Sequence, residues 1–368
     1  MMEKKHICVF LERWESGGIE SVISNILLHA DLSLFSADVV AGVIGESIFT
    51  DALRARGVNF ISLSGKLRSR ENYKSFKRLL SEKKYDVLHL NIFHGVAFKY
   101  ARIAEKMGVP VRIAHAHGAG LRPSPLRPLK LLLHKVGRAI FASSVTSRLA
   151  CSEAAGKFLY GSTEFTVVPN GADTDKFAYR PELRERARAA LGVSGTLLGA
   201  VGRLSPEKNQ SFAIDVLNEY LKADPTARLL ITGEGDMKAA LEEKAAALGI
   251  SDSIIFLGAS KCVEELVMAM DVMLFPSTAE GFGIVAIEAA VSALPVICST
   301  GVPRCVAITE RTVHLPLSEG AAAWATEAKR LVNTYPDRLD MTSEVHKAGY
   351  SAGAAANAVI TYYGGGNE

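Results

Sequence analysis

Short runs of apolar residues alternate along the chain with longer stretches in which apolar residues recur every three or four positions. The short runs predict buried strands, and the longer stretches predict helices with one apolar face. Strands that alternate with helices are typical of a parallel sheet that helices cover on both faces. In the first half of the chain we expect a helix over residues 19–30 and strands over residues 7–11, 39–43, 59–63, 87–90 and 111–115.

The pattern breaks near residues 166–170, where a strand ends at Pro169, Asn170 and Gly171, and then it restarts. The second half predicts helices over residues 210–221, 237–248 and 284–293, and strands over residues 197–201, 227–232, 254–257, 271–275 and 296–298. We therefore expect an α/β protein of two Rossmann-like, doubly wound domains facing a central cleft, where ligands bind at the carboxyl ends of the strands. The expected domains are residues 1–168 and 169–345, and residues 346–368 form a C-terminal helix and a tail.

Composition limits the class of protein. A chain of 368 residues with 48% hydrophobic and 22% charged residues is long enough for two ordinary globular domains. The N-terminal residues lack the long apolar core and the cleavage site of a signal peptide, and no apolar run reaches the ~18 residues of a membrane span. The five cysteines are scattered and form no CxxC pair, which is typical of reduced cytosolic thiols. We expect a cytoplasmic protein.

Basic residues concentrate in one part of the first half. The net charge is only +3, yet residues 54–138 contain nineteen Lys and Arg against four acids. An anionic membrane surface or a phosphate-bearing acceptor fits this excess better than nucleic acid, because no RNA-binding or helix-turn-helix motif accompanies it. Residues 129–136 predict either an interfacial helix or a core-facing helix with a basic outer face. The basic residues around them are Arg122, Arg127, Lys130, Lys135 and Arg138.

The segment around residue 280 is the most informative. A predicted strand ends at Pro276, a Gly-Phe-Gly turn follows, and an apolar helix begins at Ile284. Such a turn leaves free backbone N–H groups at a helix N-terminus, which suit a phosphate. Glu280 and Glu288 bracket this site. A carboxylate inside an apolar helix is unfavourable unless it accepts hydrogen bonds, and sugar hydroxyls are suitable donors.

Several other strand ends carry candidate binding residues. Arg203 and Lys208 follow the strand over residues 197–201 and would neutralise a diphosphate. Two turns would bring backbone close to a ligand; they contain Gly17 with Gly18, and Gly233. His115 and His117 end another strand and point to one face, so a metal is conceivable, but no third ligand lies nearby in the sequence.

These motifs together resemble retaining GT-B glycosyltransferases of family 4. The resemblance lies in the two glutamates with Gly-Phe-Gly-Ile-Val-Ala-Ile between them, in Arg203 with Lys208, and in the order of the motifs over nearly the whole chain. It implies transfer of a hexose from a nucleotide diphosphate sugar, with UDP as the expected nucleotide, to a hydroxyl of a glycan or lipid-linked acceptor. The chain looks closest to bacterial exopolysaccharide or capsule enzymes, and the implied reaction retains the anomeric configuration.

The resemblance also implies roles for individual residues. Arg203 and Lys208 would stabilise the departing diphosphate, Glu280 would hold the donor hexose, and Glu288 the ribose. His117 would contact the donor from the first, acceptor-side domain. The remaining donor-side residues are Gly281, Phe282, Gly283, Ile284, Gly233, Leu257 and Gly258, while Gly17 and Gly18 form the glycine loop. No cofactor and no metal are implied, and Asp173 and Asp175 resemble part of an interdomain segment.

Two other functions stay open at this stage. One is a nucleotide-sugar epimerase on the same fold, and the other is a non-catalytic subunit that binds a nucleotide sugar. The presence of all four charged residues, Arg203, Lys208, Glu280 and Glu288, disfavours the second. The resemblance further implies that the C-terminal helix, expected within residues 350–363, crosses back to the first domain.

Overall fold

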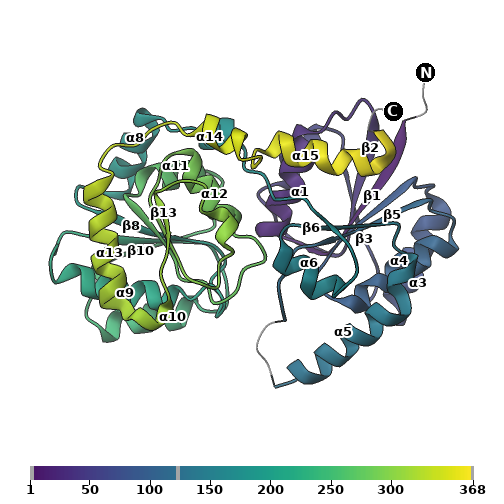
Figure 1. The fold of residues 1–368 in the computed structure, drawn as a ribbon, viewed down its shortest axis with the longest axis horizontal. Helices are drawn as coiled ribbons and strands as arrows, with labels where there is room; N and C mark the ends of the chain where they lie inside the picture. Colours follow the sequence, from purple (N-terminus) through teal and green to yellow (C-terminus); the bar gives the residue numbers. More distant parts are fainter. Residues whose placement is uncertain (1–3, 122–124, 366–368) are drawn as a thin grey trace. The chain divides into compact units, whose positions relative to one another are not determined.

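The computed structural model describes residues 4–121 and 125–365. The chain forms two compact units (Figure 1). Unit 1 consists of residues 1–171 and 352–368, and unit 2 consists of residues 172–351. The chain thus passes between the units twice, after residue 171 and after residue 351. The expected boundaries, after residues 168 and 345, lie a few residues before these points.

Unit 1 is built on a seven-stranded parallel sheet in the order β3-β2-β1-β4-β5-β6-β7. Its strands are β1 (Lys5–Trp14), β2 (Phe35–Ile44), β3 (Asn59–Ser62), β4 (Val87–Ile92), β5 (Val111–Ala116), β6 (Ser147–Ala150) and β7 (Thr166–Val167). Side chains alternate across the sheet. Val9 and Leu11 join the core under α1, whereas Phe10 packs against Phe76 and Tyr100 on the other face.

The helices of unit 1 cover both faces of this sheet. They are α1 (Gly18–His29), α2 (Thr50–Ala55), α3 (Arg70–Glu82), α4 (Phe98–Lys106), α5 (Arg127–Phe141), α6 (Glu153–Tyr160) and α15 (Ala352–Ile360). In Figure 1 α15, in yellow, lies along α1, in purple, although the two are more than three hundred residues apart. Val359 and Tyr363 share one apolar core with Val22 and Ile26. The C-terminal helix is therefore an integral part of unit 1.

Unit 2 contains a six-stranded parallel sheet in the order β10-β9-β8-β11-β12-β13. Its strands are β8 (Leu197–Val201), β9 (Arg228–Thr232), β10 (Ile254–Gly258), β11 (Val272–Phe275), β12 (Val296–Cys298) and β13 (Thr312–His314). Its helices are α7 (Thr174–Phe177), α8 (Pro181–Leu191), α9 (Gln210–Leu221), α10 (Lys238–Ala247), α11 (Val263–Ala269), α12 (Ile284–Val291), α13 (Gly320–Thr334) and α14 (Thr342–Lys347). The expected α/β class with two Rossmann-like halves is confirmed.

Three details differ from the sequence-based expectations. The strands β6 and β13 were not among the predicted strands, and each is only three or four residues long. Tyr350 lies outside the C-terminal helix, which begins at Ala352. The reason is local: Gly349 has a left-handed φ of 81°, and the Tyr350 carbonyl accepts a hydrogen bond from the Ala172 N–H.

Helix α5 exposes its apolar side chains instead of burying them. Leu126, just before the helix, and Leu129, Leu132, Leu133, Val136 and Ile140 within it are between 43% and 60% exposed. The buried side of α5 consists of His134 and Gly137, which pack against the 3-10 turn at Gly95–Ala97. The alternative of a core-facing helix with a basic outer face is therefore wrong. Arg122 lies outside the described residues.

Candidate functional site

In unit 2 the loop after β8 is tied to the segment after β11. The Thr278 N–H donates to the Glu207 carbonyl at 2.8 Å, and the Asn209 side-chain amide donates to the Pro276 carbonyl at 3.2 Å. Asn209 adopts a left-handed conformation with φ 55°, where asparagine is more tolerated than most residues. These bonds bring two motifs that are about seventy residues apart in the chain to one end of the sheet.

The two candidate cations in this loop are held differently. Lys208 Nζ lies 2.6 Å from Glu280 Oε1, and both side chains are largely buried. The pair fixes the ammonium and the carboxylate in one place before any ligand arrives. Arg203 is exposed, and within the described residues its guanidinium makes no hydrogen bond or ion pair. Arg203 is therefore available to bind an anion.

The turn after β11 ends at the N-terminus of α12. Gly283 is the N-cap, with a left-handed φ of 95°, and no side chain caps the helix. The positive end of the helix dipole and its first N–H groups thus remain available for an anion. Phe282, which we expected on the donor side, has a buried ring 5.7 Å from the ring of Tyr350. Its ring belongs to the core of unit 2.

Glu288 is a buried carboxylate on α12 that lacks a donor. Its side chain is 8% exposed, and in the described part of the chain no group donates a hydrogen bond to it. Loss of hydration raises the pKa of Glu288 to about 7, with Glu264 and Asp173 acting in the same direction. Lys176 and Lys208 oppose this rise, but they do not cancel it. Such an unsatisfied group is unfavourable unless a ligand supplies the donors.

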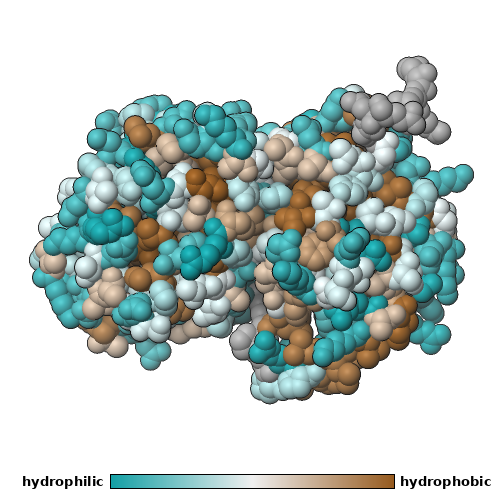
Figure 2. Space-filling model, in the orientation of Figure 1, coloured by the Kyte–Doolittle hydropathy of each residue, from teal (hydrophilic) through white to brown (hydrophobic). Residues whose placement is uncertain are grey.

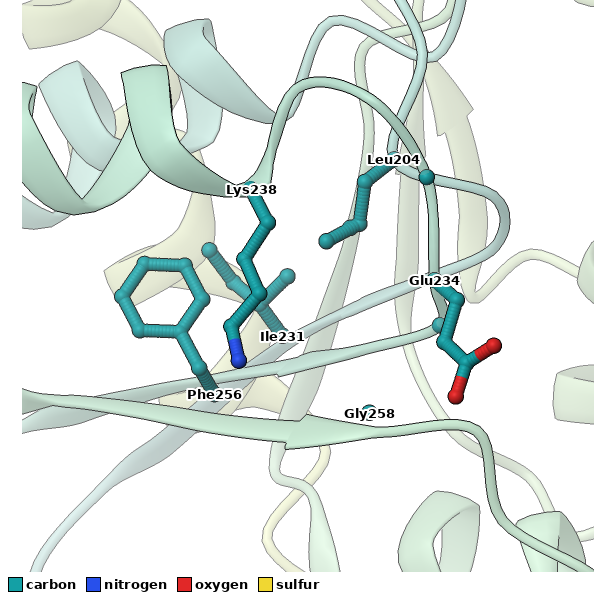
Figure 3. Close-up of a pocket in the computed structure, with 8 residues that line it drawn as sticks. Leu204, Ile231, Glu234, Lys238, Phe256 and Gly258 are labelled. Carbon is teal, nitrogen blue, oxygen red and sulfur yellow. The ribbon is translucent and has the colours of Figure 1, made fainter.

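A cavity of about 300 Å³ opens at the ends of β9 and β10 (Figure 3). Leu204, Ile231 and Phe256 form its apolar wall, and Lys238 extends into it from the start of α10. Gly233 and Gly258 also line it, whereas Leu257 is exposed and does not. A Cβ on Gly233 would lie 2.1 Å from the Gly202 carbonyl oxygen, so only glycine allows the loops after β8 and β9 to approach this closely.

In unit 1 the glycine turn forms the start of α1. Gly17 is the extended N-cap, and Gly18 is the exposed first residue of the helix. A Cβ on Gly18 would meet no atom within 4 Å, and the φ of this residue is not in the left-handed region. Neither packing nor backbone conformation explains this glycine. A ligand that approaches the backbone closely would explain it.

His117 is held at the end of β5. Its Nε2 lies 2.8 Å from Asn91 Oδ1. Because an amide oxygen only accepts hydrogen bonds, Nε2 carries the proton and Nδ1 is an acceptor, which has no partner among the described residues. Burial, with His115 and His89 nearby, holds the pKa of His117 well below its usual range, so the ring is neutral.

Near His117, the sequence candidate His115 is joined to two buried residues, His89 and Tyr363, that the sequence analysis did not connect with it. His115 Nδ1 lies 3.3 Å from His89 Nε2, and His89 Nδ1 lies 2.8 Å from the Tyr363 hydroxyl. His89 and Asn91 alternate on β4 as His115 and His117 do at β5, and these strands are neighbours. This shared period of two is the signal in the sequence that could have identified the cluster. These bonds tie His115, whose ring centre lies 4.2 Å from that of His117, to the C-terminal segment of unit 1.

Asp173 and Asp175 lie at a short helix. The Asp173 carboxylate is the N-cap of α7 and accepts a hydrogen bond from the Lys176 N–H at 3.0 Å. Asp175 is exposed in the first turn of the same helix. Residues 4–121 and 125–365 contain no group of three or more His, Cys, Asp or Glu side chains placed to hold a metal ion. Capping is thus the role that the structure gives to Asp173.

Two family models match consecutive parts of the chain. The model described as Glycosyltransferase Family 4 matches residues 16–176, and the one described as Glycosyl transferases group 1 matches residues 184–347. The chain belongs to glycosyltransferase family 4. The first match includes the glycine turn and His117 of this glycosyltransferase, and the second includes its residues from Arg203 to Glu288.

Two relatives illustrate the range of the similarity. EpsF of Bacillus subtilis (strain 168), a protein assigned as a glycosyltransferase, is 25% identical over 372 residues, which cover 98% of the family 4 chain and 96% of EpsF. An Escherichia coli UDP-Gal:alpha-D-GlcNAc-diphosphoundecaprenol alpha-1,3-galactosyltransferase is 28% identical over 238 residues, which cover 61% of this chain and 60% of that enzyme.

Solved structures share the fold of this glycosyltransferase. HepE of Anabaena, in complex with UDP-glucose, matches with a TM-score of 0.80 at 19% identity, over 97% of this chain and 98% of HepE. WaaG, a glycosyltransferase involved in lipopolysaccharide biosynthesis, matches with a TM-score of 0.74 at 17% identity, over 98% of this chain and 100% of WaaG. At such identities the likeness shows the fold, which is GT-B.

Proposed function

We propose that this glycosyltransferase moves a hexose from a UDP-linked sugar to a hydroxyl of a lipid-linked glycan in polysaccharide biosynthesis, with retention of configuration. The observation that carries the proposal is the convergence in unit 2 of Arg203, the Lys208–Glu280 pair and the uncapped N-terminus of α12. HepE binds UDP-glucose, and the Escherichia coli relative is named for a diphosphoundecaprenol-linked acceptor. Both support the same assignment of donor and acceptor.

In the proposed complex, each group of the unit 2 site binds one part of the donor. The diphosphate lies against Arg203, Lys208 and the first N–H groups of α12. The ribose hydroxyls donate to the buried Glu288 carboxylate, and the hexose hydroxyls donate to Glu280. The cavity beside Gly233 and Gly258 is the candidate site for the base.

The reaction needs no side chain that acts as a base. The bond between the anomeric carbon and the diphosphate oxygen breaks, and its electron pair leaves with that oxygen while oxocarbenium-like charge develops on the sugar. The acceptor hydroxyl attacks from the same face, and its proton passes to the departing diphosphate oxygen. Arg203 and Lys208 stabilise the developing negative charge. In unit 1, His117 offers Nδ1 as an acceptor to a substrate hydroxyl that reaches the end of β5.

Product stereochemistry and metal dependence test this proposal together. A panel of nucleotide sugars, assayed with lipid-linked acceptors, should identify a UDP-hexose whose product keeps the anomeric configuration of the donor in the NMR spectrum. EDTA-treated enzyme should keep its activity, because the cations that stabilise the diphosphate belong to the chain. An inverted product, or activity that returns only with a divalent metal, would contradict the mechanism.

Two alternatives give different results in the same assay. A nucleotide-sugar epimerase would change the sugar without an acceptor and would release no product with a new glycosidic bond. A non-catalytic subunit would bind the donor and turn nothing over. Release of UDP that depends on the acceptor therefore supports the transferase and excludes both.

We further propose that unit 1 places the enzyme on the inner face of the cell membrane. The support is helix α5, where exposed apolar side chains recur from Leu129 to Ile140 and form part of the hydrophobic surface at the lower right of Figure 2. Arg127, Lys130 and Lys135 belong to the same helix, which contains no acidic residue. An apolar face flanked by cations is typical of a helix that lies in the interface of an anionic bilayer. Among the described residues no helix is long and apolar enough to cross a membrane.

Vesicle sedimentation tests the membrane proposal. The enzyme should bind vesicles that contain phosphatidylglycerol and bind neutral vesicles poorly, since each basic residue near an anionic surface contributes about 1 kcal/mol. Replacing Arg127, Lys130 and Lys135 by alanine should weaken this binding at low salt. The double variant Leu132→Gln with Val136→Gln should weaken vesicle binding at high salt also, because salt screens charge interactions but not the burial of apolar surface.

The matched control is Leu248→Gln with Leu339→Gln, which removes exposed leucines from unit 2 and should change nothing. Equal, weak binding of the wild type to both kinds of vesicle would contradict a membrane role. Dimers that dissociate on replacing Leu132 and Val136 would instead show that a second copy covers α5.

A further inference from the structure

A groove in unit 1 collects positive charge between α3 and α4, which lie side by side (Figure 1). It encloses about 310 Å³, and its floor is formed by Tyr73 and Ile103. Among residues 4–121 and 125–365, no carboxylate lines it. The five cations that surround it are Arg68, Arg70, Lys74, Lys77 and Lys99. The volume is at the lower end of the range, about 300–1,000 Å³, of sites for small molecules.

Most of these cations have no anionic partner. In the described part of the chain Arg70, Lys74 and Lys77 take part in no ion pair and no side-chain hydrogen bond. The same helix does form such a pair elsewhere, where Arg78 Nε lies 2.6 Å from Glu82 Oε1. The groove side of α3 is thus the side on which the charge is left uncompensated.

The arrangement is electrostatically unfavourable in the absence of a ligand. Arg70, Lys74 and Lys77 are four and three residues apart, so they lie on one face of α3 and repel one another. Arg70 is also the first residue of the helix, where the helix dipole disfavours a cation. Lys99 comes from α4, and its ammonium lies 4.0 Å from the centre of the Tyr73 ring, which holds it over the floor. A bound anion would remove the repulsion among all of these groups.

The groove adjoins the end of the sheet at which ligands bind. Arg68, at its edge, has a left-handed φ of 62°, an uncommon conformation for a residue with a side chain. From there its Nη1 lies 3.0 Å from His94 Nε2 and its Nε lies 3.5 Å from Glu12 Oε1. Glu12 is near the carboxyl end of β1, and His94 follows β4. A molecule anchored in the groove would therefore extend toward these strand ends and the turn at Gly18.

We propose that the α3–α4 groove binds the diphosphate group of the acceptor. This inference rests on the proposed function and adds to it the place at which unit 1 holds the diphosphate that links the acceptor sugar to its lipid. Phosphate oxygens would accept charge-assisted hydrogen bonds from Arg70, Lys74, Lys77 and Lys99. The acceptor hydroxyl would lie at the strand ends, beyond Arg68.

Binding of inorganic pyrophosphate to the full chain tests the site. Calorimetry at fixed ionic strength, with UDP present in excess to occupy the donor site, should detect binding to the wild type. The variant Lys74→Ala with Lys77→Ala should raise the Kd for pyrophosphate on the order of tenfold or more. The control variant, Lys84→Ala with Lys106→Ala, removes the same charge from exposed positions of unit 1 outside the groove and should bind as the wild type does.

Two further binding measurements distinguish the diphosphate of an acceptor from the phosphate of membrane headgroups. Farnesyl diphosphate in detergent should lose affinity for the groove variant in the same proportion as pyrophosphate. If neither soluble diphosphate distinguishes the groove variant from the control, while vesicles of phosphatidylcholine and phosphatidylglycerol do, the groove contacts membrane headgroups and the proposal is wrong. Equal binding of every probe to both variants would overturn it as well.

Calorimetry with UDP alone keeps this test separate from that of the proposed function. The groove variant should bind UDP with the affinity of the wild type, because the donor residues belong to unit 2. A wild type that binds pyrophosphate through the groove but does not bind UDP would contradict the proposed donor and leave the groove supported.

Discussion

Replacing Arg203 by alanine is expected to lower kcat/KM by about a hundredfold and to leave the melting temperature unchanged. A preorganised charge that stabilises a leaving group contributes on the order of 10² in rate, or about 2.7 kcal/mol. Arg203 is exposed and makes no ion pair within the described residues, so its loss removes nothing from the folded state. Turnover and thermal unfolding should be measured on the same preparation.

Lys208→Ala provides an informative comparison. It should lower kcat/KM to a similar extent, but it also leaves the Glu280 carboxylate without its partner at 2.6 Å, so some stability should be lost as well. The control is Lys222→Ala, which removes an exposed cation at the C-terminal end of α9. This variant should match the wild type in both measurements. Near-normal turnover of the Arg203 and Lys208 variants would refute the assignment of the diphosphate site.

Glu288→Gln is expected to make unit 2 more stable at pH 8 while it weakens the binding of UDP. The amide keeps the shape of the side chain and removes a largely buried charge, to which none of the described residues donates a hydrogen bond. Burial raises the pKa of Glu288 from 4.5 to about 7, a difference equivalent to about 3 kcal/mol. For UDP, the loss of hydrogen bonds to a charged acceptor should raise the Kd at least tenfold.

The sign of the pH dependence follows from that raised pKa. Between pH 4.5 and pH 7 the folded state holds the proton of Glu288 more tightly than the unfolded state does, so the contribution of this group to stability declines as pH rises through this window. The decline is complete above pH 7. The Glu288→Gln variant does not show this decline in stability. The free energies of unfolding of the variant and the wild type should therefore differ little near pH 4.5 and most at pH 8.

Unfolding midpoints at pH 5 and pH 8, with and without UDP, check this prediction. Excess UDP should remove the disadvantage of the wild type at pH 8, because the ribose hydroxyls then satisfy the carboxylate. Glu182→Gln, on the exposed surface of α8, serves as the control for loss of one negative charge from unit 2. If Glu288→Gln lowers the midpoint at pH 8, the carboxylate has a partner in the unliganded protein and the argument fails.

The short apolar runs predicted most of both sheets correctly, because buried parallel strands must be apolar on both faces. The strands β6 and β13 were not predicted from their apolar residues, and the reason is physical. They contain only four and three residues, with sequences Ser-Arg-Leu-Ala and Thr-Val-His, and β13 lies at the edge of its sheet. A strand this short takes its conformation from the strands with which it pairs, so its own sequence carries little signal.

Helix α5 shows another limit of the sequence. Periodicity identifies an apolar face, but it does not say whether that face points to the core. In α5 the core side has almost no side chain: a Cβ on Gly95 would lie 2.2 Å from the His134 carbonyl oxygen, so backbone packs on backbone at Gly137. The leucines therefore remain on the outside. This close approach requires Gly95, which lies about forty residues away in the sequence.

The sequence predicted the separate motifs of the candidate site, but it did not predict which side chains of different motifs contact one another. The motif around Gly283 could be placed because one strand, one turn and one helix contain it. The Lys208–Glu280 pair joins residues 72 positions apart, and the contact of His117 with Asn91 joins two strands. Such pairs depend on sheet order and register, which no local pattern specifies.

The position of α15 has a consequence for synthesis on the ribosome. The ribosome synthesises α1, with Val22, Ile26 and Leu27, early. The residues that cover them, Val359 and Tyr363, are synthesised only after the whole of unit 2. At about 5–20 residues per second, the roughly 180 residues between the two parts of unit 1 delay its completion by roughly ten to forty seconds. For that time the nascent chain presents an uncovered apolar surface, so the half that is translated first is completed last.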